Sequence, residues 1–342
     1  MKLCVTGATG TLGSAIVRRL ATEERAANRH LYERIVCVSR DEVKQGNLAK
    51  ELEAARLDEP LRFFLADVRD EQRLAEVFAG CEAVVHTAAL KRVDRTAQDP
   101  EEVLKTNVLG TANVLRAALA AGIKKVLFVS SDKAVMPTNF YGATKQLGEQ
   151  LTVAWNAYGY PKGMISSCVR YGNVLGSRGS VLEVWAEARR KLEPILLTHG
   201  DMTRFVLTVD QAVDFILSSL ERMQGGEVFV PKLSAVRMAD VARVFAKDEN
   251  TDNIRHGDLS LKVTGLRPGG EKLHERLLSD EEPPRTLWQK DRYVVMPWHR
   301  SWTTDPYQGE RVDPLFHYAS DTVGFLDAEQ VKTLVKPWLE GA

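Results

Sequence analysis

The 342-residue chain has few cysteines, no excess of charge of either sign and no long hydrophobic run. Basic and acidic residues number 46 each, so the formal net charge is zero, which argues against generic binding to nucleic acid or anionic membranes. No apolar stretch approaches the roughly 20 residues needed to span a bilayer, and no charged-then-apolar leader precedes the first apolar run. These absences predict a cytoplasmic protein without a nucleic-acid or membrane partner.

Cysteine and histidine are too scattered for a disulfide framework or a metal site. The cysteines are Cys4, Cys37, Cys81 and Cys168. We expect them to be buried, reduced thiols. His86, His199 and His274 lack metal-ligand spacing, so no metal is predicted.

Short apolar runs alternate with helical patterns through the first half of the chain. The runs cover residues 3–5, 35–38, 63–65, 83–86, 126–130 and 165–169. Runs that are apolar throughout are typical of strands covered on both faces, and their alternation with helices indicates right-handed βαβ units. The pattern predicts the α/β class with a doubly wound parallel sheet of the Rossmann type, in which ligands bind beyond the carboxyl ends of the strands.

The pattern changes after about residue 175, where amphipathic helices replace the evident strands. We predict a Rossmann domain over residues 1–175 and a smaller, mostly helical substrate-binding region with a C-terminal cap over residues 176–342, interleaved with the first. The last 60 residues hold six of the 13 prolines and four of the 6 tryptophans. That composition is typical of an ordered but irregular cap or an oligomer contact rather than a disordered tail.

A glycine-rich turn follows the first apolar run and opens a helical pattern. Its spacing, G-x-x-G-x-x-G, lets the backbone turn tightly and approach a pyrophosphate at the positive end of a helix. We therefore predict a dinucleotide site at this turn. The residues of the turn that we predict to bind the dinucleotide are Gly7, Thr9, Gly10, Thr11, Leu12 and Gly13.

The end of the second predicted strand bears on which dinucleotide binds. Ser39 and Arg40 end that strand, and Lys44 lies one helical turn further on. A hydroxyl and two cations suit the 2′-phosphate of NADP, whereas Asp41 would suit the ribose hydroxyls of NAD. The balance favours NADP.

Two further strand ends complete the predicted cofactor site. Asp67 and Val68 follow the third strand, where the carboxylate could bind the adenine amino group. Ala88 and Ala89 follow the fourth strand, where small side chains leave room for the cofactor backbone. Both pairs can also be interpreted as ordinary loop residues without a role in cofactor binding.

Tyr141 and Lys145 have the spacing Y-x-x-x-K, which puts both side chains on one face of a helix. A nearby ammonium lowers the pKa of a phenol from ~10 towards the working pH, so Tyr141 could accept a hydroxyl proton while a carbinol hydride passes to NADP⁺. Lys145 could also hold the nicotinamide ribose, and Ser131 supplies a hydroxyl at the end of the fifth strand. Together with the glycine turn, these residues predict a catalytic site that uses a nicotinamide cofactor.

These features resemble the extended, sugar-nucleotide-modifying branch of the short-chain dehydrogenase/reductase superfamily. Within it, roughly residues 1–280 are similar to the inverting UDP-N-acetylglucosamine 4,6-dehydratases, which start bacterial pathways to pseudaminic acid and related surface sugars. The similar segments are residues 88–91, 105–107, 131–134, 170–174, 177–181, 201–205, 226–232 and 272–275.

The resemblance implies NADP-dependent dehydration of UDP-N-acetylglucosamine to a UDP-4-keto-6-deoxy-hexose with inversion at C5. Besides Tyr141, Lys145 and Ser131, a dehydratase needs a base for the C5 proton and an acid for the C6 hydroxyl. By the resemblance, Lys133 is the base and Asp132 the acid. Related retaining enzymes have an Asp-Glu pair where this chain has Asp132 and Lys133.

The resemblance also implies a set of residues that bind the UDP-sugar. They are Lys91, Lys133, Asn173, Arg178, Ser180, Thr198, Arg204, Arg267 and Glu271. Lys91 also belongs to the implied cofactor set, and Asn107 either lies near both ligands or is a structural hydrogen bonder. At Gly269-Gly270 the chain has one glycine more than the usual family run, which could shift Arg267 or Glu271.

Other functions fit the same scaffold. A UDP-sugar 4-epimerase or 5,6-dehydratase would use the same Tyr141 and Lys145, and a non-catalytic NADP-binding protein is a third alternative. The presence of Asp132 and Lys133 beside the Tyr/Lys pair favours the 4,6-dehydratase. A homo-oligomer formed through helices flanking the sheet is also implied by the resemblance.

Overall fold

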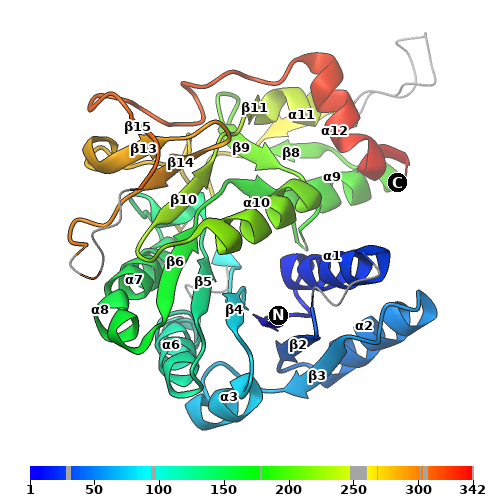
Figure 1. The fold of residues 1–342 in the computed structure, drawn as a ribbon. Coiled ribbons are helices and arrows are strands. Elements are labelled where there is room, and N and C mark those ends of the chain that lie inside the picture. Colours follow the sequence, from blue (N-terminus) through cyan, green and yellow to red (C-terminus); the bar gives the residue numbers. More distant parts are fainter. Residues whose placement is uncertain are drawn as a thin grey trace.

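The computed structural model describes residues 1–27, 32–93, 98–177, 179–246, 260–267, 269–300, 302 and 307–340. Its centre is a ten-stranded sheet in the order β15-β13-β14-β10-β6-β5-β4-β1-β2-β3 (Figure 1). The seven parallel strands are β3 (Leu61–Leu65), β2 (Arg34–Ser39), β1 (Lys2–Thr6), β4 (Ala83–His86), β5 (Lys125–Val129), β6 (Ile165–Val169) and β10 (Val228–Pro231). The order 3-2-1-4-5-6 is that of dinucleotide-binding sheets, which confirms the predicted doubly wound fold.

Helices cover both faces of this sheet, as Figure 1 shows. One face carries α1 (Thr11–Ala27), α2 (Glu42–Ala54) and α10 (Val209–Arg222). The other face carries α3 (Glu71–Phe78), α6 (Gly110–Ala120) and α7 (Phe140–Ala154). In β1, Leu3 and Val5 pack into the first core and Cys4 into the second, which is why the strands are apolar at every position.

Residues beyond 175 contribute to both parts of the molecule. A second lobe contains the three-stranded sheet β11 (Ala235–Arg237), β9 (Thr203–Leu207) and β7 (Asn173–Val174), and the pair β12 (Leu261–Val263) and β8 (Ile195–Leu197). Its helices are α9 (Val181–Arg190), α11 (Met238–Ala246) and α12 (Ala328–Glu340), which share a core around Trp185 and Phe245. The chain also returns to the large sheet, which it extends with antiparallel β14 (Arg292–Val295), β13 (Thr286–Trp288) and β15 (Glu310–Arg311).

Several short helices connect these elements. They are α5 (Pro100–Leu104), the π-helical turn η1 (Lys105–Leu109), η2 (Asp132–Ala134), α8 (Asn156–Gly159), η3 (Tyr160–Lys162) and η4 (Pro283–Arg285). The four cysteines are buried and free, as predicted. His86 is a buried core residue whose ring nitrogens form hydrogen bonds with the hydroxyls of Thr6 and Thr111. Among the described residues, no helix is long and apolar enough to cross a membrane, and no group of three or more His, Cys, Asp or Glu could hold a metal.

Candidate active site

A cavity of about 310 Å³ opens where β1, β2, β3 and β4 end. Most of the residues predicted to bind the cofactor line it: Gly7, Thr9, Gly10, Ser39, Arg40, Lys44, Asp67, Val68, Ala88 and Ala89. Gly7 has a φ of +72°, and a Cβ there would lie 2.8 Å from the backbone nitrogen of Ala88. A Cβ at Gly13 would lie 2.2 Å from the carbonyl oxygen of Gly7, so Gly13 lets α1 pack against the turn.

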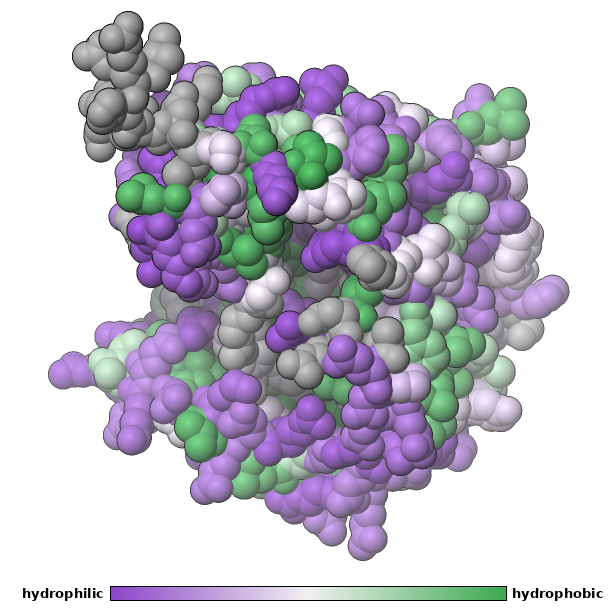
Figure 2. Space-filling model, turned by 180° about the vertical axis from the view of Figure 1, so that it is seen from behind, coloured by the Kyte–Doolittle hydropathy of each residue, from purple (hydrophilic) through white to green (hydrophobic). Residues whose placement is uncertain are grey.

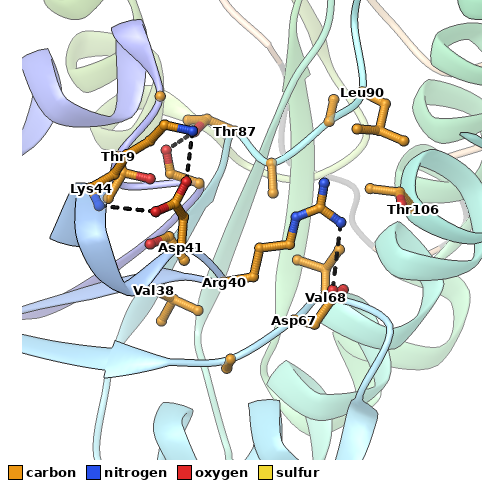
Figure 3. A pocket seen from close by; sticks show the side chains of 16 residues that line it. Thr9, Val38, Arg40, Asp41, Lys44, Asp67, Val68, Thr87, Leu90 and Thr106 are labelled. Atoms are coloured by element: carbon orange, nitrogen blue, oxygen red, sulfur yellow. Dashed lines mark hydrogen bonds and ion pairs between the residues drawn. The ribbon is translucent and has the colours of Figure 1, made fainter. Parts of the chain in front are cut away.

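The polar groups of this cavity are arranged for an anionic ligand (Figure 3). The hydroxyls of Ser39 and Thr106 are buried and have no hydrogen-bond partner. Arg40 extends across the cavity and its guanidinium lies 3.7 Å from the carboxylate of Asp67. Asp41 accepts a hydrogen bond from the backbone N–H of Lys44, which caps α2, and its other oxygen lies 2.7 Å from the Lys44 ammonium.

Six residues of the predicted cofactor set do not line this cavity, within the part of the chain that the structure describes; two of them, Tyr141 and Lys145, lie on α7. Thr11, Leu12 and Gly13 form the first turn of α1, and Lys91 follows the lining residue Leu90. Sequence reasoning missed Thr87, Leu90 and Thr106 as lining residues. Leu90 and Thr106 belong to segments that carry the family resemblance, but the resemblance gave them no role, and Thr87 has no distinguishing local pattern. Asn107 receives a hydrogen bond from the Leu90 N–H (2.8 Å) and donates to Thr144 (3.1 Å), so it is a structural bridge between that loop and α7.

Tyr141 and Lys145 lie on α7, which Asn139 caps through its side chain. Both residues are buried. The Lys145 ammonium donates to the carbonyl oxygen of Val129 at 2.6 Å and lies 4.4 Å from the centre of the Phe128 ring.

The prediction that a neighbouring ammonium brings the pKa of Tyr141 towards neutral is wrong for the protein alone. Burial dominates and raises the pKa of Tyr141 to about 12, although Lys133 and Ser131 counteract it. Burial also lowers the pKa of Lys145 to about 8. Desolvation penalises the phenolate form of Tyr141 and the ammonium form of Lys145. The Lys145 ammonium also donates a hydrogen bond to the carbonyl oxygen of Val129.

Asp132 and Lys133 form the short helix η2 directly after β5. Asp132 is fully buried, and its Oδ1 accepts hydrogen bonds from Ser131 (2.7 Å) and from the Lys133 ammonium (3.0 Å). Its Oδ2 is buried without a hydrogen-bond partner. Lys133 also donates to Asn173 at 3.2 Å, so the structure brings these predicted residues together.

A buried glutamate completes this cluster, and sequence reasoning gave it no role. Glu275 is 3% exposed, and its Oε1 lies 3.5 Å from the Lys133 ammonium. Glu275 belongs to the segment of residues 272–275 that carries the family resemblance. The sequence therefore indicated the motif, but it did not indicate the contact between Glu275 and Lys133.

The remaining predicted substrate residues lie on the second lobe and on the segment before Glu275. Arg204 is buried, donates to the backbone oxygens of residues 203, 272 and 273, and lies 3.6 Å from Glu271. Arg267 is exposed and donates to the same carboxylate at 2.6 Å.

The Ser180 hydroxyl, at the start of α9, is buried without a partner, and Thr198 donates to the sulfur of Met202. Arg178 lies outside the described residues. Seen from behind, the surface is hollowed between the two parts of the molecule (Figure 2).

Comparison with known proteins decides the family. The profile of polysaccharide biosynthesis proteins matches residues 3–297. A UDP-N-acetylglucosamine 4,6-dehydratase (inverting) of Campylobacter jejuni is 34% identical over 331 residues, which cover 93% of this chain and 92% of that protein. The chain belongs to the polysaccharide biosynthesis protein family. A UDP-glucose 4-epimerase of Rickettsia rickettsii is another relative, 34% identical over 337 residues that cover 97% of this chain and 94% of that protein.

Solved structures share the fold of this family member. The X-ray structure of Pen from Bacillus thuringiensis has a TM-score of 0.86 and 28% identity, and the match covers 98% of this chain and 97% of that one. The dTDP-glucose 4,6-dehydratase DesIV of Streptomyces venezuelae, solved with NAD, shares the fold with a TM-score of 0.64 at 22% identity, over 78% and 88% of the two chains. The protein is thus an enzyme of the nucleotide-sugar dehydratase and epimerase class.

The second glycine of the Gly269-Gly270 run has a packing role in this family member. Gly270 has a φ of +88°, and its carbonyl oxygen accepts hydrogen bonds from Thr138 and Asn139, just before Tyr141. A Cβ at Gly270 would lie 2.0 Å from the carbonyl oxygen of Thr138. The glycine therefore lets the segment that carries Glu271 and Glu275 pass against the catalytic loop.

We expect Gly270→Ala to lower kcat/KM by up to about 10²-fold, because the loop before Tyr141 must shift, and misplacement by about 1 Å can cost that much. Gly269→Ala is the matched control, since Gly269 has a φ of +103° but no atom within 4 Å of its Cβ position. Steady-state kinetics of both variants would check this. Equal losses in the two would show that left-handed backbone strain, not the contact with Thr138, is responsible.

Proposed function

We propose that this chain is an NADP-dependent UDP-N-acetylglucosamine 4,6-dehydratase that inverts the configuration at C5. The observation that carries the proposal is the ion pair of buried Asp132 with partly buried Lys133, whose charges act on Tyr141. An epimerase needs only the tyrosine, the lysine and a hydroxyl residue, whereas dehydration also needs an acid and a base. The activity named for the Campylobacter relative supports the same conclusion.

The cavity beside the glycine turn fits NADP. The unpartnered Ser39 hydroxyl, with Arg40 and Lys44, offers a hydroxyl and two cations to a 2′-phosphate, while Asp41 is already engaged by the helix cap and by Lys44. Bound NADP⁺ would accept a hydride from C4 of the sugar, and the reduced form would return it to C6. Lys145 is the residue that would hold the nicotinamide ribose.

In the first step, Tyr141 takes the proton of the C4 hydroxyl. Because burial raises the pKa of Tyr141 to about 12, the phenolate requires positive charge nearby. Lys133 already provides such charge, and Lys145 lies one helical turn away on the same helix. The 4-ketone that results acidifies the C5 proton.

In the second step, Asp132 and Lys133 exchange one proton across their 3.0 Å hydrogen bond. Burial alone would lower the pKa of Lys133, but the carboxylates of Asp132 and Glu275 outweigh it and raise that pKa well above its usual range, so the resting pair is ammonium and carboxylate. Transfer of the proton from Nζ to Oδ1 gives an amine that removes the C5 proton and an acid that protonates the leaving C6 hydroxyl. Water leaves, and the pair returns to its resting charges. C5 is then reprotonated from the opposite face by a proton that comes from solvent, and Tyr141 releases to solvent the proton that it took from the C4 hydroxyl.

The UDP moiety would lie along the second lobe. The unpartnered Ser180 hydroxyl stands at the N-terminus of α9, where a diphosphate is favoured by the helix dipole. The exposed guanidinium of Arg267 could reach the same group, and Glu271 would face the nucleoside. Arg204 shapes this region by holding Glu271 and the backbone of residues 272–273.

A UDP-sugar 4-epimerase is the second candidate, because a relative of equal identity carries that name. Incubation of the purified protein with UDP-N-acetylglucosamine in deuterium oxide, followed by proton NMR and mass spectrometry, separates the two. We expect loss of one water, a new C6 methyl group, deuterium at C5 and an altered ring configuration. A 4-epimer that keeps its C6 hydroxyl would establish the epimerase instead, and a 5,6-unsaturated product would indicate a 5,6-dehydratase.

Arg40→Ala should weaken NADP⁺ binding by about 10- to 100-fold, since a hydrogen bond to a charged group contributes about 1.5–3 kcal/mol. NAD⁺ binding should change little, because NAD⁺ lacks the 2′-phosphate. Calorimetric titration with both dinucleotides would measure the ratio, with exposed Arg62→Ala on β3 as the control. Equal weakening for both cofactors would contradict the assignment of the 2′-phosphate to Arg40.

A further inference from the structure

We propose that Glu275 is a positioning residue for Lys133: its carboxylate holds the Lys133 ammonium in place and keeps the proton of the Asp132–Lys133 pair on the lysine until substrate is bound. This inference rests on the proposed function and deepens it. The sequence pattern assigns Glu275 no role, and the mechanism above counts it only as one of two carboxylates near Lys133, without a positioning role.

The contacts around the Lys133 ammonium are complete only with Glu275. An ammonium has three N–H donors. The three groups around it are Asp132 Oδ1 at 3.0 Å, Asn173 Oδ1 at 3.2 Å and Glu275 Oε1 at 3.5 Å. Each comes from a different segment of the chain, so the lysine side chain is held from three directions.

Glu275 is itself fixed in place by its backbone. Its N–H donates to the Ser320 hydroxyl (2.9 Å), and its carbonyl oxygen accepts from the Ser320 N–H (2.8 Å). These two hydrogen bonds anchor the backbone of Glu275, and its carboxylate lies beside Lys133. Its Oε2 is buried without a hydrogen bond and lies 3.7 Å from the Lys272 ammonium.

A purely structural ion pair between Glu275 and Lys272 does not account for this geometry. Lys272 donates to the carbonyl oxygen of Val135 at 2.5 Å, closer than its approach to Glu275. A buried carboxylate oxygen left without a hydrogen bond is costly, and such groups are frequent where function requires them. The charged groups that face Lys133 are Asp132, Glu275, Arg204 and Lys272, with Tyr141 close by.

The electrostatic consequence follows from the signs of these charges. Glu275 favours the charged form of Lys133, whereas burial and Arg204 oppose it. With Glu275 neutralised, the lysine would lose its proton more readily and its side chain would lose one of three anchors. The Asp132–Lys133 pair would then no longer hold one proton in a fixed geometry.

The test uses Glu275→Gln, with Glu275→Asp as the conservative variant and exposed Glu329→Gln on α12 as the control. Trace acetylation followed by mass spectrometry reports the amine fraction of Lys133 and requires no catalytic activity, with exposed Lys336 as the internal reference. We expect Glu275→Gln to increase Lys133 labelling at least tenfold, which corresponds to about one unit of pKa. The aspartate variant should stay within a few-fold of the wild type.

Kinetics with UDP-N-acetylglucosamine provide the second measurement. We expect Glu275→Gln to lower kcat about tenfold or more and to leave KM nearly unchanged, because Glu275 contacts Lys133 rather than the sugar. Unchanged labelling together with unchanged kcat would overturn the inference. If the labelling responds but the wild type forms no dehydrated product, the proposed function fails, while the assignment of Glu275 as the residue that keeps Lys133 charged stands.

Discussion

Replacement of Tyr141 by phenylalanine should lower kcat by about 10²–10⁴-fold, the range that a positioned acid or base contributes. The phenol is the proton acceptor for the C4 hydroxyl in the proposed mechanism, and no other described side chain of α7 occupies its place beside Ser131 and Lys133. Phenylalanine keeps the ring and removes only the hydroxyl. The binding of the UDP-sugar should therefore change little, and the loss should fall on kcat.

Product formation by NMR and calorimetric binding of the UDP-sugar would measure these two effects separately. Tyr158→Phe is the matched control, because Tyr158 is 65% exposed and lies outside the site. If the Tyr141→Phe enzyme retained more than a tenth of the wild-type kcat, Tyr141 would not be the proton acceptor for the C4 hydroxyl.

Replacement of Arg170 by methionine should destabilise the protein by about 3–5 kcal/mol, because it removes the counter-charge that two buried carboxylates share and leaves Glu282 only its longer contact with Arg285. Arg170 forms paired hydrogen bonds with Glu149 on α7 (3.0 and 2.6 Å) and with Glu282 (2.7 and 2.9 Å), and it donates to the carbonyl oxygen of Leu277. All three charged side chains are buried. A fall in melting temperature of roughly 10 °C follows from the size of the chain.

The loss should depend on pH in a defined direction. Burial alone would raise the pKa of Glu282, but Arg170 outweighs it and holds that pKa below its usual range. In the wild type, this contribution is present at neutral pH and is lost as the pH falls through the lowered pKa. In the variant, the buried Glu282 carboxylate has lost its main counter-charge and protonation relieves it, so the difference in melting temperature should shrink as the pH falls from 8 to 5.

Calorimetry across that pH range would check the prediction. Arg243→Met is the control, since Arg243 is exposed on α11 and its pair with Asp240 is solvated, so little change is expected. A difference between Arg170→Met and wild type that stayed constant with pH would show that lost packing, not lost charge, explains the destabilisation.

The parts of the site predicted from the sequence are those with short local patterns. The glycine turn around Gly7 and the Y-x-x-x-K spacing of Tyr141 and Lys145 can be read locally, because each depends on one strand end or one helix face. The apolar runs likewise predicted six of the seven parallel strands, and they missed β10. The resemblance added Asp132 and Lys133, and the structure shows them in direct contact.

The parts that sequence reasoning missed depend on long-range packing. Glu275 meets Lys133 across more than 140 positions in the chain, and no local pattern reports that contact. Strands β13, β14 and β15 were missed because they are only two to four residues long, so that no apolar run or alternation of useful length marks them. The raised pKa of Tyr141 was missed because burial cannot be judged from spacing.

The return of the chain to the large sheet makes the two parts of the protein interdependent. Strand β10 pairs with β6, the last parallel strand contributed by the first 175 residues, and β14 then pairs with β10. A fragment that ended near residue 175 would present β6 as an open edge, with unpaired backbone groups that invite association with other chains. The two halves therefore depend on one another for solubility, and genetic separation of the nucleotide-binding half from the rest would yield an aggregation-prone product rather than an independent domain.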